Sequence, residues 1–319
     1  MPADGSHRFS WRVLQEYGIG VALVLEVALF SLLSPYFLTT DNVLNVTLQT
    51  SITAIIAVGM TFVILTGGID LSVGSLVALV GVVTTMMLKI DIPITAVFVV
   101  AVFGGLLAGT FSGFAAGVFI TRFRIAPFIA TLALMTIWRG TGFILTGGRP
   151  IWELPPQFSA LATGRLVGLP IPTLLMLLTF AAAHIVLTRT RFGRAVYAVG
   201  GNIEAARLAG IRTSAVLVSV YTVSGVLSAM SGILLASRIN SGQPNAGLMY
   251  ELDVIAAVVV GGTSLSGGKG TVLGTLIGSL LIGVLRNGLN LLNVESYVQQ
   301  VVVGAVILLA VMWDQLQKR

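Results

Sequence analysis

Two apolar runs of this chain are interrupted by the same short polar turn, G-G-x-x-L-S. It occupies positions 67–72, after Met60–Leu65, and positions 261–266, after Val254–Val260. A break of this kind frees backbone groups that lipid cannot satisfy, so it persists only where protein or a water-filled path supplies partners. A matching pair of glycine-interrupted segments in two halves of a chain is typical of transport proteins. The pattern predicts a polytopic membrane protein that moves a solute.

The composition excludes an ordinary soluble domain. Of 319 residues, 56% are hydrophobic and 9% are charged, whereas about 25% charged residues is normal for a soluble protein. A membrane helix needs about 20 apolar residues, so the chain has room for about ten helices and for no soluble nucleotide-binding domain. Cysteine is absent and the two histidines lie far apart, so we expect no disulfide, no metal site and no cofactor bound by this chain.

We predict an all-α protein with about ten transmembrane helices in a single transmembrane domain, residues 1–319. Two pseudo-repeated halves are expected, roughly 1–168 and 169–319, with some helices broken or re-entrant. The eighth segment is too short to span a membrane alone. The predicted helices are Gly18–Leu33, Ser51–Leu65, Val73–Leu88, Ile94–Ile120, Phe128–Leu145, Ile171–Leu187, Ala215–Ala236, Leu252–Val260, Val272–Leu285 and Tyr297–Met312.

The net charge of +6 indicates membrane topology rather than nucleic-acid binding. Cytoplasmic loops carry an excess of Lys and Arg, and ten crossings would place every basic stretch and both termini on the cytoplasmic side. The first apolar segment contains Glu26 and lacks a convincing cleavage site, which favours an uncleaved helix over a signal peptide. The basic stretches are Arg8 and Arg12, Arg122 and Arg124, Arg189 to Arg212, and Lys318 with Arg319.

Two stretches carry glycine at every fourth position. On a helix this spacing forms a groove that another backbone can approach closely, which is a main source of helix association in lipid. The groove suits packing within the chain or a dimer interface, and both alternatives stay open. These glycines are Gly105, Gly109, Gly113 and Gly117, and then Gly270, Gly274 and Gly278.

The basic loop 188–213 contains a short helix with clear start and stop signals. Asn202 is a favourable N-cap, Glu204 suits the positive first turn, and Ala205 and Ala206 favour helix. Gly210 can end the helix in the left-handed conformation. Because a two-turn helix is marginal alone, we expect it to dock against another surface; the alternative is a solvated connector.

A second glycine-rich stretch, 262–271, approaches the phosphate-binding pattern G-x-x-x-x-G-K-[ST]. Its spacing is one residue too long, and Gly270 stands where a metal-binding hydroxyl must follow Lys269. We therefore expect this chain to bind no ATP itself.

The segment 57–75, the loop 198–211 and the stretches 241–252 and 260–270 resemble the permease subunits of bacterial ABC importers for ribose, arabinose, xylose and galactosides. The resemblance extends from about Pro35 to Asp314 and is strongest to ribose-type permeases. It implies a permease homodimer in the bacterial inner membrane, a cytoplasmic ATP-binding subunit that binds the ATP, and a periplasmic sugar-binding protein. It also implies that Glu204–Gly210 is the coupling helix that contacts the ATPase, with Asn202 at its start.

Polar residues near the breaks are candidates for the sugar path. Asp70 is expected either to contact sugar hydroxyls or to cap the helix that starts near Val73, as is Ser72. Gln243, Asn245, Glu251 and Asp253 lie on the external side of the eighth segment. Their amides and carboxylates suit sugar hydroxyls, and docking of the binding protein is an equal alternative.

Arg139 and Arg286 are further polar candidates within apolar segments. Such arginines are expected to pair with a carboxylate (Glu26, Asp70 or Asp253) or to extend to the membrane interface.

A proton- or sodium-coupled secondary sugar transporter, with Glu26 or Asp70 as the ion site, is the competing class. Broken helices suit it equally well, but the basic loop and the family resemblance favour the ABC permease. The ionisable residues are too few and scattered to form a visible active site, so we expect no enzyme activity.

Overall fold

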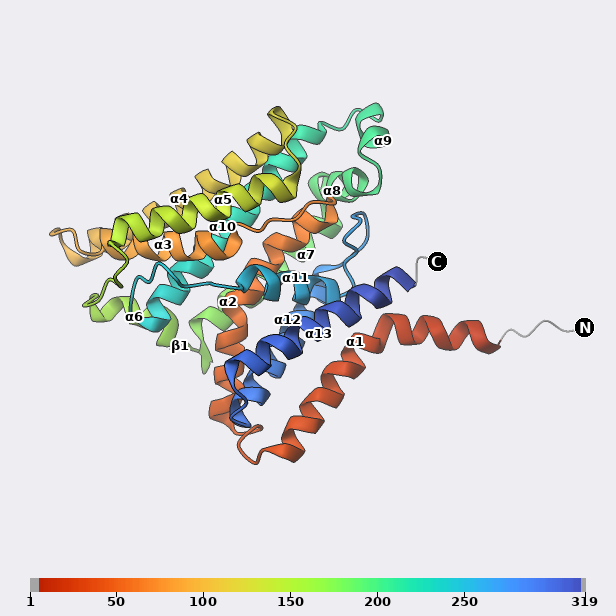
Figure 1. The fold of residues 1–319 in the computed structure, drawn as a ribbon, viewed down its shortest axis with the longest axis horizontal. Coiled ribbons are helices and arrows are strands. Elements are labelled where there is room, and N and C mark those ends of the chain that lie inside the picture. The colour runs from red at the N-terminus through yellow and green to blue at the C-terminus, as the bar shows by residue number, and fades with distance from the viewer. Residues whose placement is uncertain (1–5, 317–319) are drawn as a thin grey trace, which may run out of the picture.

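The computed structural model describes residues 6–316, and this range folds almost entirely into helices that form one elongated bundle (Figure 1). Strands β1 (Arg165–Leu166) and β2 (Leu169–Pro170) pair as a small antiparallel hairpin. The helices are α1 (Ser6–Leu33), α2 (Thr40–Leu65), α3 (Val73–Met87), α4 (Ile94–Arg122), α5 (Pro127–Thr146), α6 (Pro156–Thr163), α7 (Ile171–Arg189), α8 (Arg191–Gly201), α9 (Ile203–Leu208), α10 (Thr213–Ile239), α11 (Tyr250–Val260), α12 (Val272–Leu291) and α13 (Ser296–Leu316).

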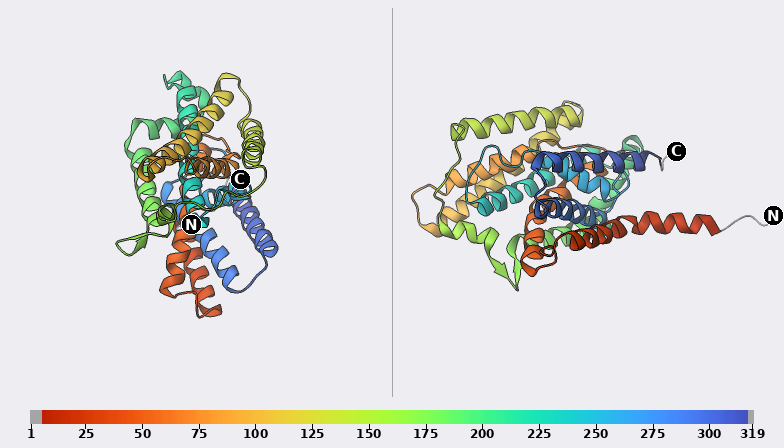
Figure 2. Two further views of the ribbon diagram at one scale, coloured as in Figure 1. Left: turned by 90° about the vertical axis from the view of Figure 1, so that its left-hand side faces the viewer. Right: turned by 60° about the horizontal axis from the view of Figure 1, so that its bottom comes forward.

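The bundle has two distinct ends (Figures 1 and 2). Helices α8 and α9 lie at one end, and the first turns of α1 and the last turns of α13 point toward the same side. Helix α6 and the β-hairpin lie at the opposite end. We call these the α9 end and the α6 end.

The fold class agrees with the expected polytopic helical protein. Within the described residues, six helices are long and apolar enough to cross a membrane, namely α2, α4, α5, α7, α10 and α12. Shorter apolar segments lie in α1, α3 and α13. Helix α11 has 11 residues, which is about half the length that a membrane span needs. It is therefore long enough to cross only part of a membrane.

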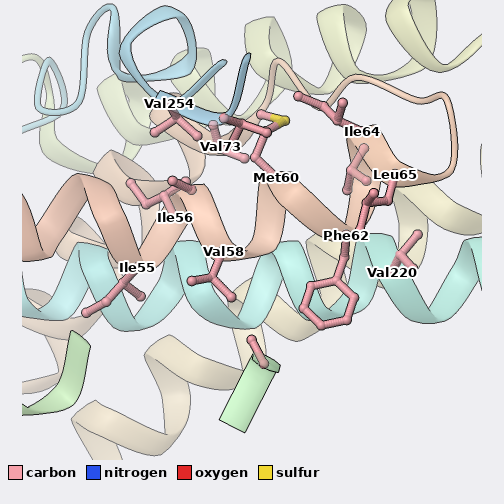
Figure 3. Close-up of a cluster of buried hydrophobic side chains, with 14 of the residues drawn as sticks. Ile55, Ile56, Val58, Met60, Phe62, Ile64, Leu65, Val73, Val220 and Val254 are labelled. Carbon is pink, nitrogen blue, oxygen red and sulfur yellow. The ribbon is translucent and has the colours of Figure 1, made fainter. Parts of the chain in front are cut away.

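Helix α2 is the central element of the bundle, and its side chains from Ser51 to Leu65 are almost all buried. Figure 3 shows its aliphatic side chains packed with Val220 of α10 and Val254 of α11. Because lipid gives apolar burial little advantage, close packing and interhelical hydrogen bonds must hold such helices together. One such bond joins the hydroxyls of Thr61 and Thr275, on α12, at 2.8 Å.

The predicted start of α2 at Ser51 was wrong. The helix begins at Thr40, where the side chain of Thr39 accepts a hydrogen bond from the backbone of Asn42 and caps the first turn. The first turns carry polar residues that resemble a loop in sequence. In the fold they have partners, because the side-chain amides of Asn42 and Asn287, on α12, bond to each other at 3.0 Å.

The first glycine row faces α10 of the same chain. A Cβ added to Gly109 would overlap Ala229, and one added to Gly113 would overlap the backbone of Tyr221. Gly105 faces α3 and α10, and Gly117 faces Val218. In the structure of the single chain, this row therefore brings α4 and α10 into backbone contact.

Only part of the second glycine row lies on a helix in the structure. Gly274 and Gly278 of α12 lie against the backbone of Gly261 and Ala257, so they pack α12 on α11. Gly270 was expected in the same row, but α12 begins at Val272 and Gly270 belongs to the preceding turn with φ +148°. The predicted start of the helix, Val272, was right, but the expectation that Gly270 lies on it was wrong.

Candidate functional site

The two G-G-x-x-L-S turns meet at the α9 end. The backbone N–H of Gly268, just after the second turn, donates to the carbonyl of Leu65, just before the first, at 2.9 Å. Gly200, in the last turn of α8, lies between them so closely that an added Cβ would overlap the Leu65 oxygen and lie 2.6 Å from the Gly268 nitrogen. Three distant segments thus contact one another through bare backbone.

Helix α8 also holds the second turn with a side chain. The hydroxyl of Tyr197 donates to the carbonyl of Gly270 at 2.9 Å. Burial raises the pKa of the Tyr197 phenol, so it remains a hydrogen-bond donor at neutral pH. The contact fixes α8, and therefore the start of α9, relative to the turn.

Helix α9 has the start and stop signals that the sequence predicted. The side-chain oxygen of Asn202 accepts a hydrogen bond from the backbone N–H of Ala205 at 3.0 Å, and Gly210 is left-handed with φ +82°. Glu204 and Arg207 form an exposed ion pair at 2.7 Å. Ala205 is exposed, whereas Ala206 is buried and packs α9 on the rest of the chain.

Asp70 and Ser72 form a buried hydrogen-bonded turn between α2 and α3. One carboxylate oxygen of Asp70 accepts from the backbone N–H of Ser72 at 3.0 Å and from its hydroxyl at 2.6 Å. The other accepts from the hydroxyl of Ser224, on α10, at 2.9 Å. This geometry matches the structural alternative for Asp70, since the carboxylate ties the start of α3 to α10. Ser72 occupies the N-cap position, but its side chain makes no cap bond.

Arg139 on α5 holds the α10–α11 loop, where two of the candidate path residues lie. Its guanidinium donates to the carbonyls of Pro244 and Ala246 at 2.8 and 2.7 Å. In this loop Gln243 is half-buried and Asn245 is exposed. The sequence predicted a carboxylate partner or a position at the interface for such an arginine, and Arg139 instead bonds to backbone oxygens.

Glu251 and Asp253, both in the first turn of α11, have different environments. One Glu251 oxygen is buried against Gly74 and has no hydrogen-bond partner among the described residues. Asp253 is paired with Arg286 of α12 at 2.5 Å, which is the carboxylate pairing expected for Arg286. The four path candidates therefore do not converge on one point.

Two cavities flank the centre of the bundle. The first, of about 360 Å³, lies at the α9 end beside the first turn, and its lining includes Gly67, Gly68, Arg124 and Tyr221. The second, of about 190 Å³, lies toward the α6 end between α2 and α10 to α13. Of the candidate path residues, only Asp253 lines either cavity.

Sequence reasoning missed most of the polar lining of the second cavity. Gln49 and Thr50 come from the part of α2 that was read as loop, and Arg238 lies just past the predicted end of α10. A polar residue at each end of an apolar segment is the signal that would have found them. Their convergence depends on the helix ends, which single-sequence reasoning places least well.

Buried polar turns, half-length helices and internal cavities in an apolar bundle define a polytopic membrane transport protein. Residues 42–311 match the family described as the permease component of branched-chain amino acid transport systems, and the chain belongs to this family.

Curated relatives resemble the chain over almost its whole length. It is 48% identical to the ribose import permease protein RbsC of Haemophilus influenzae, covering 95% of this chain and 94% of the relative. It is 47% identical to the ribose import permease protein RbsC of Bacillus subtilis, over 95% and 94%. The L-arabinose ABC transporter permease protein AraH of Azospirillum brasilense is 37% identical, over 97% and 90%. No solved structure matches the chain.

Proposed function

We propose that this chain is the membrane-spanning permease subunit of an ATP-driven importer for ribose or a closely related monosaccharide. The observation that carries the proposal is the 48% identity to a ribose import permease across 95% of the chain. Relatives named for D-allose and L-arabinose are less similar, at 36% and 37% identity. Ribose is therefore the first sugar to test.

The energy would come from a separate ATP-binding subunit that contacts α9. This helix projects from the α9 end, and Ile203 and Leu208 at its two ends are 45% and 85% exposed. Exposed apolar side chains on a short, well-capped helix suit a groove on a partner. Movement of α9 would reach the centre of the bundle through the backbone contacts of Gly200 with both turns.

The α9 end would face the cytoplasm. Eight of the 18 Lys and Arg residues lie at this end, and the cytoplasmic side of a membrane protein is enriched in Lys and Arg. Both termini would then be cytoplasmic, and the α6 end would face the periplasmic sugar-binding protein. The basic residues at the α9 end are Arg122, Arg124, Arg189, Arg191, Arg194, Arg207, Arg212 and Lys269.

A second copy of the chain would complete the transporter. No observation favours the ion-coupled alternative: Asp70, one of its two candidate ion sites, is held by hydroxyl and backbone donors from Ser72 and Ser224, and the relatives are named as import permeases or ABC transporter permeases.

The test is to tag the chain, extract it gently from its native membrane, and identify the accompanying proteins by mass spectrometry. An ATP-binding subunit should co-purify, and ATP should drive ribose uptake when the complex is reconstituted with the binding protein. If the chain purified alone and carried sugar into sealed vesicles under an ion gradient without ATP, the secondary-transporter reading would replace the proposal.

A further inference from the structure

The cavity toward the α6 end is lined by an unusual density of polar groups for the inside of a membrane protein. Five helices contribute to it, and its lining includes Gln49, Thr50, Arg238, Tyr250 and the Asp253–Arg286 ion pair. Ionisable residues inside a membrane bundle are costly, and they generally mark a substrate or ion pathway.

Several of these groups have no hydrogen-bond partner among the described residues. The buried hydroxyl of Thr50 and the Nε of Arg286 make no hydrogen bond to any described residue. The half-buried guanidinium of Arg238 likewise makes none within residues 6–316. Buried polar groups are nearly always hydrogen-bonded, and burying one without a hydrogen-bond partner costs free energy. Because these side chains line the cavity, a polar occupant suits it better than an apolar one.

The chemistry of the lining suits a neutral sugar. Arginine offers several fixed donors, and the Asp253 carboxylate and the Gln49 amide offer acceptors. A sugar hydroxyl in this cavity can therefore both accept and donate a hydrogen bond. The half-buried ring of Tyr250 adds an apolar surface. The lining carries two guanidinium groups and one carboxylate, so an anionic relative of the sugar is the comparison that the test must include.

The size also agrees. The cavity of about 190 Å³ holds about six water molecules at ~30 Å³ each. One monosaccharide ring with its hydroxyls displaces a comparable volume.

We propose that this cavity binds the transported monosaccharide inside each permease subunit, with Arg238, Thr50 and the Asp253–Arg286 pair contacting its hydroxyls. The inference rests on the proposed sugar-import function and adds the binding site to it.

A polar seam leads from the cavity toward the α9 end. Ser224, Ser228 and Ser231 recur at helical spacing on one face of α10, and all three are buried. Ser231 donates to the backbone of Ile52 on α2, whereas Ser228 has no partner among the described residues. One turn further, Tyr221, whose hydroxyl is also buried, lines the 360 Å³ cavity. A row of buried hydroxyls on α10 thus lies between the two cavities.

The first test compares variants of the complete complex reconstituted with its ATP-binding subunit and binding protein. Arg238→Gln removes the unpaired charge, and Thr50→Val removes the hydroxyl at nearly constant shape. Matched controls are Arg149→Gln, in an exposed loop, and Thr179→Val, whose hydroxyl bonds to its own helix. Ribose uptake and ATP hydrolysis stimulated by the binding protein are measured together.

We expect Arg238→Gln to raise the half-saturating ribose concentration at least about tenfold and Thr50→Val about threefold to tenfold, since each loses a hydrogen bond to sugar. The two control variants keep the wild-type half-saturating concentration and the wild-type stimulated ATP hydrolysis. If wild-type protein transports ribose and both pocket variants match it, the site is wrong and the function stands. If wild-type protein transports no sugar with ATP, the function and the site both fail.

A second measurement does not depend on how the first variants fold. The chain has no cysteine, so Thr53→Cys places a single thiol in the cavity lining. Ribose should slow its reaction with a small thiol reagent, and it should leave a Leu208→Cys thiol on α9 unaffected. Equal labelling of Thr53→Cys with and without ribose, or stronger protection by ribose 5-phosphate, would overturn the proposal.

Discussion

Replacing Gly200 by alanine should damage the junction between α8 and the two turns. The new Cβ would overlap the carbonyl oxygen of Leu65 and lie 2.6 Å from the nitrogen of Gly268. Those two atoms form the hydrogen bond that joins the turns. Both neighbours are backbone, so neither can move aside as a flexible side chain would. Gly201, the next residue of the same helix, has open space around its own Cβ position.

The magnitude follows from two contributions. Forcing extra volume into a packed contact costs about 1–3 kcal/mol, and losing one backbone hydrogen bond costs about 0.5–1.5 kcal/mol. Gly200→Ala should therefore destabilise the fold by about 2–4 kcal/mol. Gly201→Ala should be neutral or stabilise by up to about 1 kcal/mol, since alanine is the better helix former.

The assay is the thermal midpoint at which each purified variant loses its monodisperse peak in size-exclusion chromatography. At roughly 2 °C per kcal/mol for a chain of this length, Gly200→Ala should lower the midpoint by about 4–8 °C. Gly201→Ala should stay at or above the wild-type value. Equal midpoints for the two variants would refute the inference that Gly200 forms a backbone-to-backbone junction.

Three further outcomes are expected. Gly109→Ala should lower the thermal midpoint through an overpacking cost of about 1–3 kcal/mol, whereas Gly140→Ala, facing open space, should not; similar losses would contradict the assigned α4–α10 contact. Asp70→Asn should keep near-normal protein level and ribose uptake, because the amide oxygen can accept both bonds from Ser72 and the amide NH2 can donate to the Ser224 hydroxyl, which now donates to the carboxylate; lost uptake at normal level would give the carboxylate a role in transport. Single cysteines at exposed Leu208 and Val167 should react with an impermeant thiol reagent from the cytoplasmic and external sides respectively, and reaction of both from one side would refute the orientation.

The sequence predicted those features that depend on local patterns. Apolar periodicity located α3 at its observed start, Val73, and placed α4 and α5 within a few residues of their observed bounds. Cap chemistry predicted α9, because Asn202 and Gly210 act on their own neighbours. The pairing of Arg286 with a carboxylate was also predictable, since an ion inside a membrane bundle needs a counter-charge.

The remaining features depend on contacts between distant parts of the chain. Helix α8 was read as part of a basic loop, and α6 and the β-hairpin fell in a polar connection; tertiary contacts stabilise such short elements more than propensity does. The polar start of α2 became predictable only with α12 beside it, as the bond between Asn42 and Asn287 shows. The same holds for the cavity toward the α6 end, whose lining comes from five helices.

The hydrogen bond between Asp70 and Ser224 sets a condition on how the protein is made. The two residues are 154 positions apart, so a ribosome working at ~5–20 residues per second needs about 8–30 s to make the second after the first. Throughout that interval the α2–α3 turn carries a carboxylate whose partner on α10 does not yet exist. One of its oxygens already accepts from the neighbouring Ser72, but a carboxylate whose other oxygen has no partner is poorly tolerated in lipid. Until α10 is inserted, α2 and α3 therefore need a polar or protein-lined environment. Insertion of α10 then completes their burial.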